Sequence, residues 1–358
     1  MRETLYSLQI LRFLAAALVM LSHVEHSLSG FRERYGAEVL IFGISGDLGV
    51  RIFFVISGFI MVYIAHDAFG KPGAPGRFLA ARIVRVVPLY WLLTTLQILV
   101  FLLLARLGDP SGAALLSVPE VVKSYVFIPY FNLYAQHRPI LSQGWTLNYE
   151  MFFYLAFAAS LFLRRTLGLS VLIAALLGLT VAGTLDWQQD VMRAWTHPIL
   201  LEFVIGIALA LVKLHLMRNG RGVLGFRHVL PACLALIVAV TAFPQAVPAA
   251  HTLVAMLTVG LCVLCVDANP TRPAVGILVV LGNASYSLYL SHSFIFLFVD
   301  PLWRKLLGGQ YLGFYFLLVT GTALALGYLT YRCIELPMNG FLRSALLRRG
   351  PRPAPVPR

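Results

Sequence analysis

Residues 5–26, LYSLQILRFLAAALVMLSHVEH, form the apolar stretch that most constrains how this chain can fold. A helix of this length can cross the hydrocarbon core of a bilayer. The stretch nevertheless contains Arg12 and His23, and ionisable side chains inside a span usually face a protein interior or a water-filled cavity. At about 100° per residue, roughly three turns separate the two, so both lie on one helix face, about 16 Å apart along the axis. The pattern fits a reaction path across part of a membrane, and it fits equally well two polar groups satisfied by neighbouring helices.

The composition extends this prediction to the whole chain. Of its 358 residues, 59% are hydrophobic and only 12% are charged, which is far from the balance of a soluble domain. We therefore predict an all-α, polytopic integral membrane protein, a bundle of about ten transmembrane helices. The predicted spans are 5–28, 40–66, 83–106, 145–163, 168–185, 196–216, 224–243, 249–267, 275–298 and 311–331. Residues 1–340 form the predicted membrane domain, and residues 341–358 form a basic, Pro-rich tail that we expect to be disordered.

The net charge of +13 follows from where the basic residues fall. With the N-terminus in the cytoplasm, roughly eighteen of the 28 Lys and Arg residues lie in inner segments and about eight in outer loops. This bias predicts that both termini are cytoplasmic, and it explains the charge without a nucleic-acid partner. A cleavable signal peptide is not expected, because Arg12 interrupts the apolar region. His23 then lies near the outer end of the first span and Arg12 nearer its inner end.

The cysteines give no sign of a metal site. Cys262 and Cys265 form a CxxC pair, but the pair lies in an apolar segment without a second ligand pair nearby. We interpret these thiols as small hydrophobic side chains and predict no metal site.

Several other polar groups sit in or beside predicted spans. Arg82 and Arg85 are three residues apart and share a helix face at the cytoplasmic mouth, where they could hold phosphates or anchor the helix to lipid headgroups. Asp47 and Arg51 are four apart and can pair on one face. The glycines of this second span allow close helix approach.

Two embedded acids and a late polar stripe are further candidates. Glu150 lies at about the depth of His23, and a carboxylate paired with this ring would orient it. Glu202 is a second embedded acid that could share the same polar interior. Ser285, Tyr289 and His292 follow i, i+4 and i+7, a stripe that could line a channel or satisfy buried hydrogen bonds.

One loop and one charged pair complete the candidate functional features. The aromatic and polar loop over residues 124–145 is expected to fold over the outer end of the bundle as a lid or an acceptor-binding surface. Near the C-terminus, Arg332 and Glu335 are expected to form an ion pair at the inner end.

In combination, these motifs resemble the membrane-bound acyltransferase-3 family, most closely its exopolysaccharide O-acetyltransferase branch. The resemblance extends from Leu5 to Pro337. The matching strings are, in order, Arg12 followed after ten residues by His23, then GVRIFFVISGF, RIVRVVPLYW, GWTLNYEMFFY and SYSLYLSH. Each string alone is weak to moderate, but in this order, in a chain with about ten predicted spans, they are jointly specific. The match departs from the family at Arg51, where many members have Asp.

This resemblance implies transfer of an acyl group, usually acetyl, from cytoplasmic acyl-CoA to a hydroxyl of a surface polysaccharide or its lipid-linked precursor. It also implies a bacterial-type inner (plasma) membrane and three kinds of partner: the lipid bilayer, a carbohydrate or lipid-linked oligosaccharide acceptor, and polysaccharide-assembly proteins. The implied site residues are His23 as general base, with Arg12 and Glu150; Arg82 and Arg85 for the CoA phosphates; and Ser57, Trp145, Glu202, Ser285, Tyr286, Tyr289 and His292 along the substrate path.

Three other functions fit the same residues. A transporter of a sugar or a lipid-linked intermediate would also carry polar residues in its spans, although no pair of interrupted helices in two related halves is evident. An acyltransferase could act on a lipid, peptidoglycan, an antibiotic or a protein instead of a polysaccharide. A non-enzymatic assembly factor for polysaccharide export is the third alternative.

Overall fold

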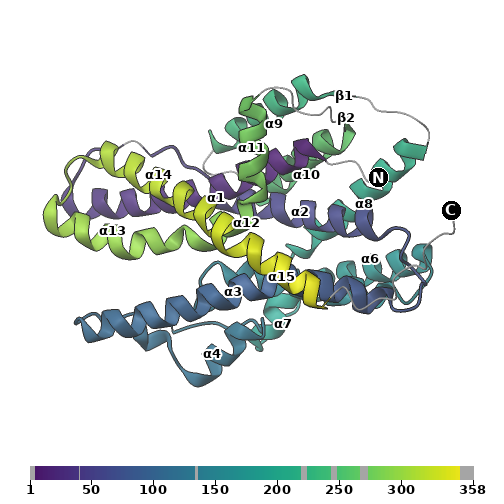
Figure 1. The fold of residues 1–358 in the computed structure, drawn as a ribbon, viewed down its shortest axis with the longest axis horizontal. Helices are drawn as coiled ribbons and strands as arrows, with labels where there is room; N and C mark the ends of the chain where they lie inside the picture. Colours follow the sequence, from purple (N-terminus) through teal and green to yellow (C-terminus); the bar gives the residue numbers. More distant parts are fainter. Residues whose placement is uncertain are drawn as a thin grey trace, which may run out of the picture.

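The computed structural model describes residues 5–39, 41–133, 136–218, 224–242, 248–266 and 273–346. These residues form a helical bundle whose longest helices run along the long axis of the molecule (Figure 1). The helices are α1 (Tyr6–Tyr35), α2 (Gly46–Ala65), α3 (Ala74–Arg106), α4 (Val118–Tyr125), α5 (Gly144–Ser160), α6 (Arg165–Ala182), α7 (Asp190–Trp195), α8 (Leu200–Arg218), α9 (Phe226–Thr241), α10 (Pro248–Leu264), α11 (Pro273–Asn283), α12 (Ser285–Ser291), α13 (Ser293–Leu306), α14 (Leu312–Thr330) and α15 (Leu336–Leu346).

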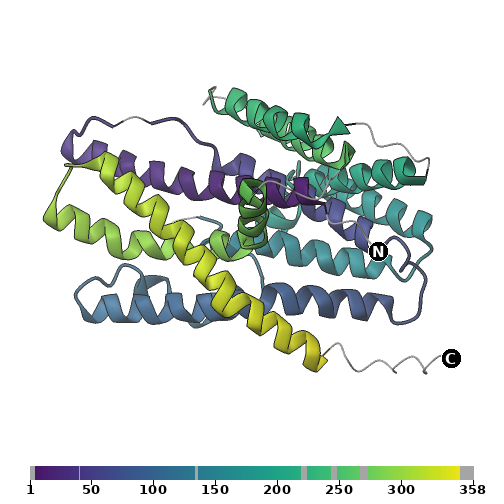
Figure 2. The ribbon, with the colours of Figure 1, turned by 45° about the horizontal axis from the view of Figure 1, so that its top comes forward.

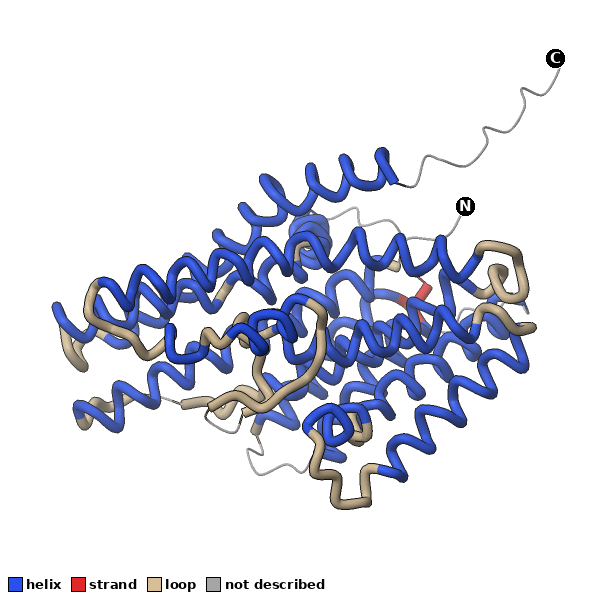
Figure 3. The backbone as a smooth tube through the Cα atoms, turned by 90° about the horizontal axis from the view of Figure 1, so that it is seen from below, coloured by secondary structure: helices blue, strands red, loops and turns tan. Residues whose placement is uncertain are grey.

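Short irregular elements connect these helices. A 3₁₀ turn, η1, covers Ala113–Leu115, and a π-helical turn, η2 (Tyr331–Glu335), joins α14 to α15. Figure 2 shows this last pair crossing the bundle obliquely. Two two-residue strands, β1 (Leu224–Gly225) and β2 (Cys265–Val266), pair in parallel beside α9 and α10, and they appear in red in Figure 3.

The centre of the bundle is built by α2 against α8 and α1. A Cβ at Gly58 would lie 2.3 Å from the carbonyl oxygen of Phe203, and one at Gly206 would lie 2.2 Å from that of Val55. A Cβ at Gly49 would similarly meet the Ala15 carbonyl oxygen of α1 at 2.5 Å. Small residues therefore let these backbones touch, as the glycines of the second span predicted.

The all-helical prediction is confirmed for the described residues, apart from the two-residue strands. Six segments of the described chain are long and apolar enough to cross a membrane. They are Tyr6–Tyr35, Gly46–Ala65, Ala74–Arg106, Arg165–Ala182, Asp190–Met217 and Leu312–Ala345. The total of ten spans and the cytoplasmic termini stay predictions.

Two predicted segments differ from the structure. The ninth span, expected as one helix over 275–298, is broken at Ala284 and His292 into α11, α12 and α13. Within a membrane, a helix is interrupted only where other protein groups or a water-filled cavity can hydrogen-bond the freed backbone N–H and C=O groups. We therefore expect this break to face the protein interior. At the C-terminus, α15 extends to Leu346, across the predicted boundary at 340. The rest of the predicted tail lies outside the described residues.

Candidate active site

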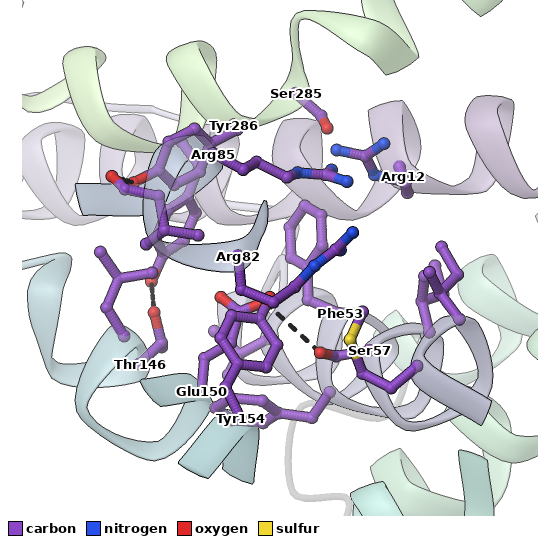
Figure 4. A pocket seen from close by; sticks show the side chains of 18 residues that line it. Arg12, Phe53, Ser57, Arg82, Arg85, Thr146, Glu150, Tyr154, Ser285 and Tyr286 are labelled. Atoms are coloured by element: carbon purple, nitrogen blue, oxygen red, sulfur yellow. Dashed lines mark hydrogen bonds between the residues drawn. The ribbon is translucent and has the colours of Figure 1, made fainter. Parts of the chain in front are cut away.

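A pocket with an empty volume of about 760 Å³ lies between α1, α2, α3, α5 and α12 (Figure 4). Eight of the predicted site residues line it. They are Arg12, Ser57, Arg82, Arg85, Glu150, Ser285, Tyr286 and Tyr289. Five separate helices thus bring together residues that are up to 277 positions apart, the span from 12 to 289.

The pocket is positively charged. Three arginines (Arg12, Arg82 and Arg85) and one carboxylate (Glu150) line it, and three minus one leaves a formal charge of +2. Among the described residues, none of these arginines has a carboxylate within the 4.0 Å of an ion pair. Figure 4 shows the guanidinium groups of Arg12 and Arg85 side by side near Ser285. This excess charge suits an anionic ligand.

Two buried donors in the pocket lack a partner in the described part of the chain. They are Nε of Arg82 and Oγ of Ser285. Buried polar groups are normally hydrogen-bonded, and an unsatisfied one costs free energy. Both residues line the pocket, so a ligand that fills it can satisfy them.

Glu150 is held on the pocket wall by neighbouring hydroxyls. It accepts hydrogen bonds from Ser57, at 3.4 Å, and from Tyr154, one turn further along α5. The predicted pairing with His23 is not observed among the described residues. Similar depth in the bundle does not fix which way a helix faces, and α5 turns Glu150 toward α2 and α3.

His23 lies outside the pocket lining and against His292. The two ring centroids are 5.2 Å apart. Nδ1 of His292 lies 3.0 Å from the Leu288 carbonyl oxygen; since a carbonyl only accepts, Nδ1 must carry the proton. Nε2 is then a bare lone pair, and it is buried without a partner in the described chain.

Tyr289 links the two histidines to the pocket. Its ring lies 6.4 Å from that of His292, and its hydroxyl contacts Thr146 Oγ1 at 2.8 Å and the Gln143 carbonyl oxygen at 3.2 Å. Both Tyr289 and Thr146 line the pocket. Tyr289 therefore lies between the pocket and the two histidine rings.

Two other predicted site residues lie elsewhere. Glu202 is a partner of Arg51, with its Oε1 2.6 Å from Nη1, and it also accepts a hydrogen bond from Thr252 at 2.8 Å. Arg51 is also paired with Asp47 at 2.7 Å, which confirms the predicted i, i+4 contact. Trp145 faces a different cavity, on the other side of α5.

Glu335 was assigned the wrong partner. Its expected ion pair with Arg332 is not among those of the described residues, and Glu335 instead accepts a hydrogen bond from Ser287 at 2.6 Å. This carboxylate lies in the π-helical turn η2 and faces α12.

Thr146 and Tyr154 were not among the predicted site residues. Both line the pocket, at i−4 and i+4 from Glu150, so a search for a polar stripe at helical spacing would have found them. No group of three or more metal-ligating side chains occurs within the described ranges.

Comparisons with known proteins identify the family of the chain. Residues 5–332 match the acyltransferase-3 family, described as an acyltransferase domain. The chain is 33% identical, over 311 residues, to the exopolysaccharide production protein ExoZ of Rhizobium meliloti, an alignment covering 85% of this chain and 90% of that protein. It is 25% identical over 326 residues to the acyltransferase MdmB of Streptomyces mycarofaciens, covering 85% and 81% of the two chains. No solved structure matches it. A match over nearly the whole chain, together with membrane-length helices around a buried polar pocket, shows that this protein belongs to the acyltransferase-3 family.

Proposed function

We propose that this protein transfers an acyl group, most simply acetyl, from acyl-CoA to a hydroxyl of a polysaccharide or its lipid-linked precursor. The observation that carries the proposal is the pocket with a formal charge of +2 and two donors, Arg82 Nε and Ser285 Oγ, that have no partner among the described residues. CoA is a polyanion, and its phosphates are the groups that arginines bind best. The similarity to ExoZ, a protein of exopolysaccharide production, supports a carbohydrate acceptor.

In the proposed reaction, the phosphates of acyl-CoA bind at Arg12, Arg82 and Arg85, and the thioester extends past Tyr289 toward His23. His23 takes the proton of the acceptor hydroxyl, the oxygen attacks the thioester carbonyl carbon, and the carbon–sulfur bond breaks. The imidazolium then returns its proton to the departing thiolate. The products are an ester and CoA, with no change of oxidation state.

His292 has a positioning role in this mechanism. Its Nε2, which has no partner in the part of the chain that the structure describes, is available to accept the N–H of His23. That contact fixes the tautomer of His23 and leaves the other ring nitrogen free as the base.

The test is CoA release from acetyl-CoA by membranes that contain the protein, with a total lipid-linked oligosaccharide extract as acceptor. We expect acceptor-stimulated release by the wild type and none by His23→Ala. The matched control is His26→Ala, an exposed histidine on the same helix, which should keep full activity. Normal activity of a well-expressed His23→Ala protein would refute the role of His23. Solute transport without CoA dependence would favour the transporter.

A further inference from the structure

A second cavity, with an empty volume of about 1640 Å³, lies where the first turns of α2, α5, α8 and α10 meet. Under the predicted orientation, all four helices begin on the outer side. The lining includes Arg51 of α2, Tyr149 of α5, Leu201 of α8 and Thr252 of α10. We call it the outer cavity.

The outer cavity is separate from the arginine pocket, and the two linings share no residue. Helix α5 divides them. Trp145 and Tyr149, four apart, face the outer cavity, while Thr146 and Glu150, also four apart, face the pocket. One helix thus carries an aromatic face for one compartment and a polar face for the other.

Aromatic rings in mutual contact form one wall of the outer cavity. Tyr149 lies at its centre, with ring centroids at 6.0 Å from Trp145, 5.9 Å from His137 and 6.2 Å from His197. Phe131 extends the wall at 5.6 Å from His137. The rings meet edge to face, with 90° between Tyr149 and Trp145, and Tyr149 is buried. The half-buried Trp145 is therefore the ring that can offer an apolar face to a ring-shaped ligand, and the few polar groups beside it can fix its orientation.

The charges around this cavity are compensated. Arg51 is paired with both Asp47 and Glu202. Arg193 lies 4.7 Å from the centre of the Phe131 ring, and the Asp190 carboxylate accepts the Phe131 N–H at 3.1 Å. Burial, aided by neighbouring His197, lowers the pKa of His137 to about 4, so this ring is neutral at pH 7.

Hydrogen-bonding groups remain available beside the aromatic wall. His137 Nε2 is buried without a partner among the described residues. Asp47 keeps 42% of its side chain exposed. Balanced charge, an aromatic wall and open hydrogen-bonding groups together suit a neutral, hydroxyl-rich ring better than a polyphosphate.

We propose that the outer cavity is the binding site for the saccharide portion of the acceptor, with a sugar ring packed on Trp145. This proposal rests on the acyltransferase function proposed above. Its connection to the reaction runs along one segment of the chain: His137 lines the cavity, and the Gln143 carbonyl oxygen, six residues further on, accepts a hydrogen bond from the Tyr289 hydroxyl at 3.2 Å. A sugar held in the cavity therefore lies next to the segment that contacts Tyr289.

The kinetic test compares Trp145→Ala with Trp187→Ala. Trp187 is a half-buried tryptophan outside the cavity, with its indole N–H donated to the Ala182 carbonyl oxygen at 2.7 Å. We expect Trp145→Ala to raise the apparent KM for the oligosaccharide extract about tenfold, since a lost aromatic contact is of that size, and to leave the KM for acetyl-CoA unchanged. Trp145→Phe should restore most of the acceptor affinity. Equal effects of the two alanine variants, or a matching rise in the acetyl-CoA KM, would overturn the proposal.

A second test measures saccharide binding directly and does not depend on catalysis. Ala249 lines the cavity and is exposed, so Ala249→Cys in a Cys333→Ser background gives a single accessible thiol, because Cys233, Cys262 and Cys265 are buried. We expect oligosaccharides released from the lipid-linked extract by mild acid to slow its labelling by a membrane-impermeant maleimide. The matched control, Ser111→Cys on an exposed loop, should label at the same rate with and without saccharide.

The two tests separate the two proposals. Protection of Ala249→Cys without CoA release by the wild type would support the saccharide site and refute the acyltransferase function. CoA release without protection would refute the saccharide site alone.

Discussion

We expect Arg82→Ala to act mainly by weakening the binding of the acyl donor, acetyl-CoA. The Arg82 guanidinium lies in the pocket, 5.8 Å from the centre of the Phe78 ring, and its Nε has no partner in the described chain. Its removal lowers the formal charge of the pocket from +2 to +1, because three arginines become two against one carboxylate. A hydrogen bond to a charged group contributes about 1.5–3 kcal/mol, so the apparent KM for acetyl-CoA should rise roughly 10- to 150-fold.

The assay is an acetyl-CoA titration of CoA release at a fixed, saturating acceptor concentration. Arg82→Lys keeps the positive charge but loses the planar guanidinium group with its several N–H donors, so its KM for acetyl-CoA should lie between those of the wild type and Arg82→Ala. The control is Arg77→Ala, since Arg77 begins the same helix but is exposed and donates to the Pro72 carbonyl oxygen at 3.1 Å. The reasoning fails if Arg82→Ala lowers only the amount of protein in the membrane while the KM of the surviving enzyme is normal. That result would make Arg82 a lipid anchor.

Three further changes test other parts of the structure. Glu202→Leu leaves the buried Arg51 with only its half-exposed partner, Asp47, and should destabilise the protein by about 3 kcal/mol. The melting temperature in detergent should fall, while the KM for acetyl-CoA should stay unchanged. Gly58→Ala forces α2 and α8 apart and should cost about 1–3 kcal/mol, whereas Gly178→Ala, with no atom within 4 Å of the new Cβ, should leave the melting temperature equal or higher. Because the pKa of His137 is about 4 when folded and 6.5 when unfolded, only the unfolded state gains a proton as pH falls from 7 to 5. The free energy of unfolding should then drop by at most about 2 kcal/mol. His137→Gln should make the melting temperature less dependent on pH between 7 and 5, and an unchanged pH dependence would contradict this prediction.

The sequence predicted the local relations best. Helical spacing placed Arg12 and His23 on one face and paired Asp47 with Arg51, because such contacts depend only on the 3.6-residue repeat. Apolar length located the helices, although it could not show the break at Ala284, because a local kink leaves the hydropathy unchanged.

Contacts between helices were harder to predict. Arg51 and Glu202 are 151 residues apart, and nothing in either local sequence indicates that α2 and α8 touch. The same holds for the contact between His23 and His292, which depends on how α1 and α12 are rotated about their axes. The predicted pairing of Glu150 with His23 failed for the same reason, because it depends on how α5 is rotated about its axis. Depth follows from position along a span, but the direction of a side chain follows from packing.

The backbone contact at Gly58 and Gly206 also determines which parts of the molecule can move. Helix α2 carries Ser57 on the pocket wall and Arg51 on the wall of the outer cavity, and at Gly58 it rests directly on the main chain of α8. A contact without intervening side chains leaves no rotamers to rearrange, so we expect α2 and α8 to move as one unit. An opening that admits or releases a substrate would then come from the other helices that line the two cavities.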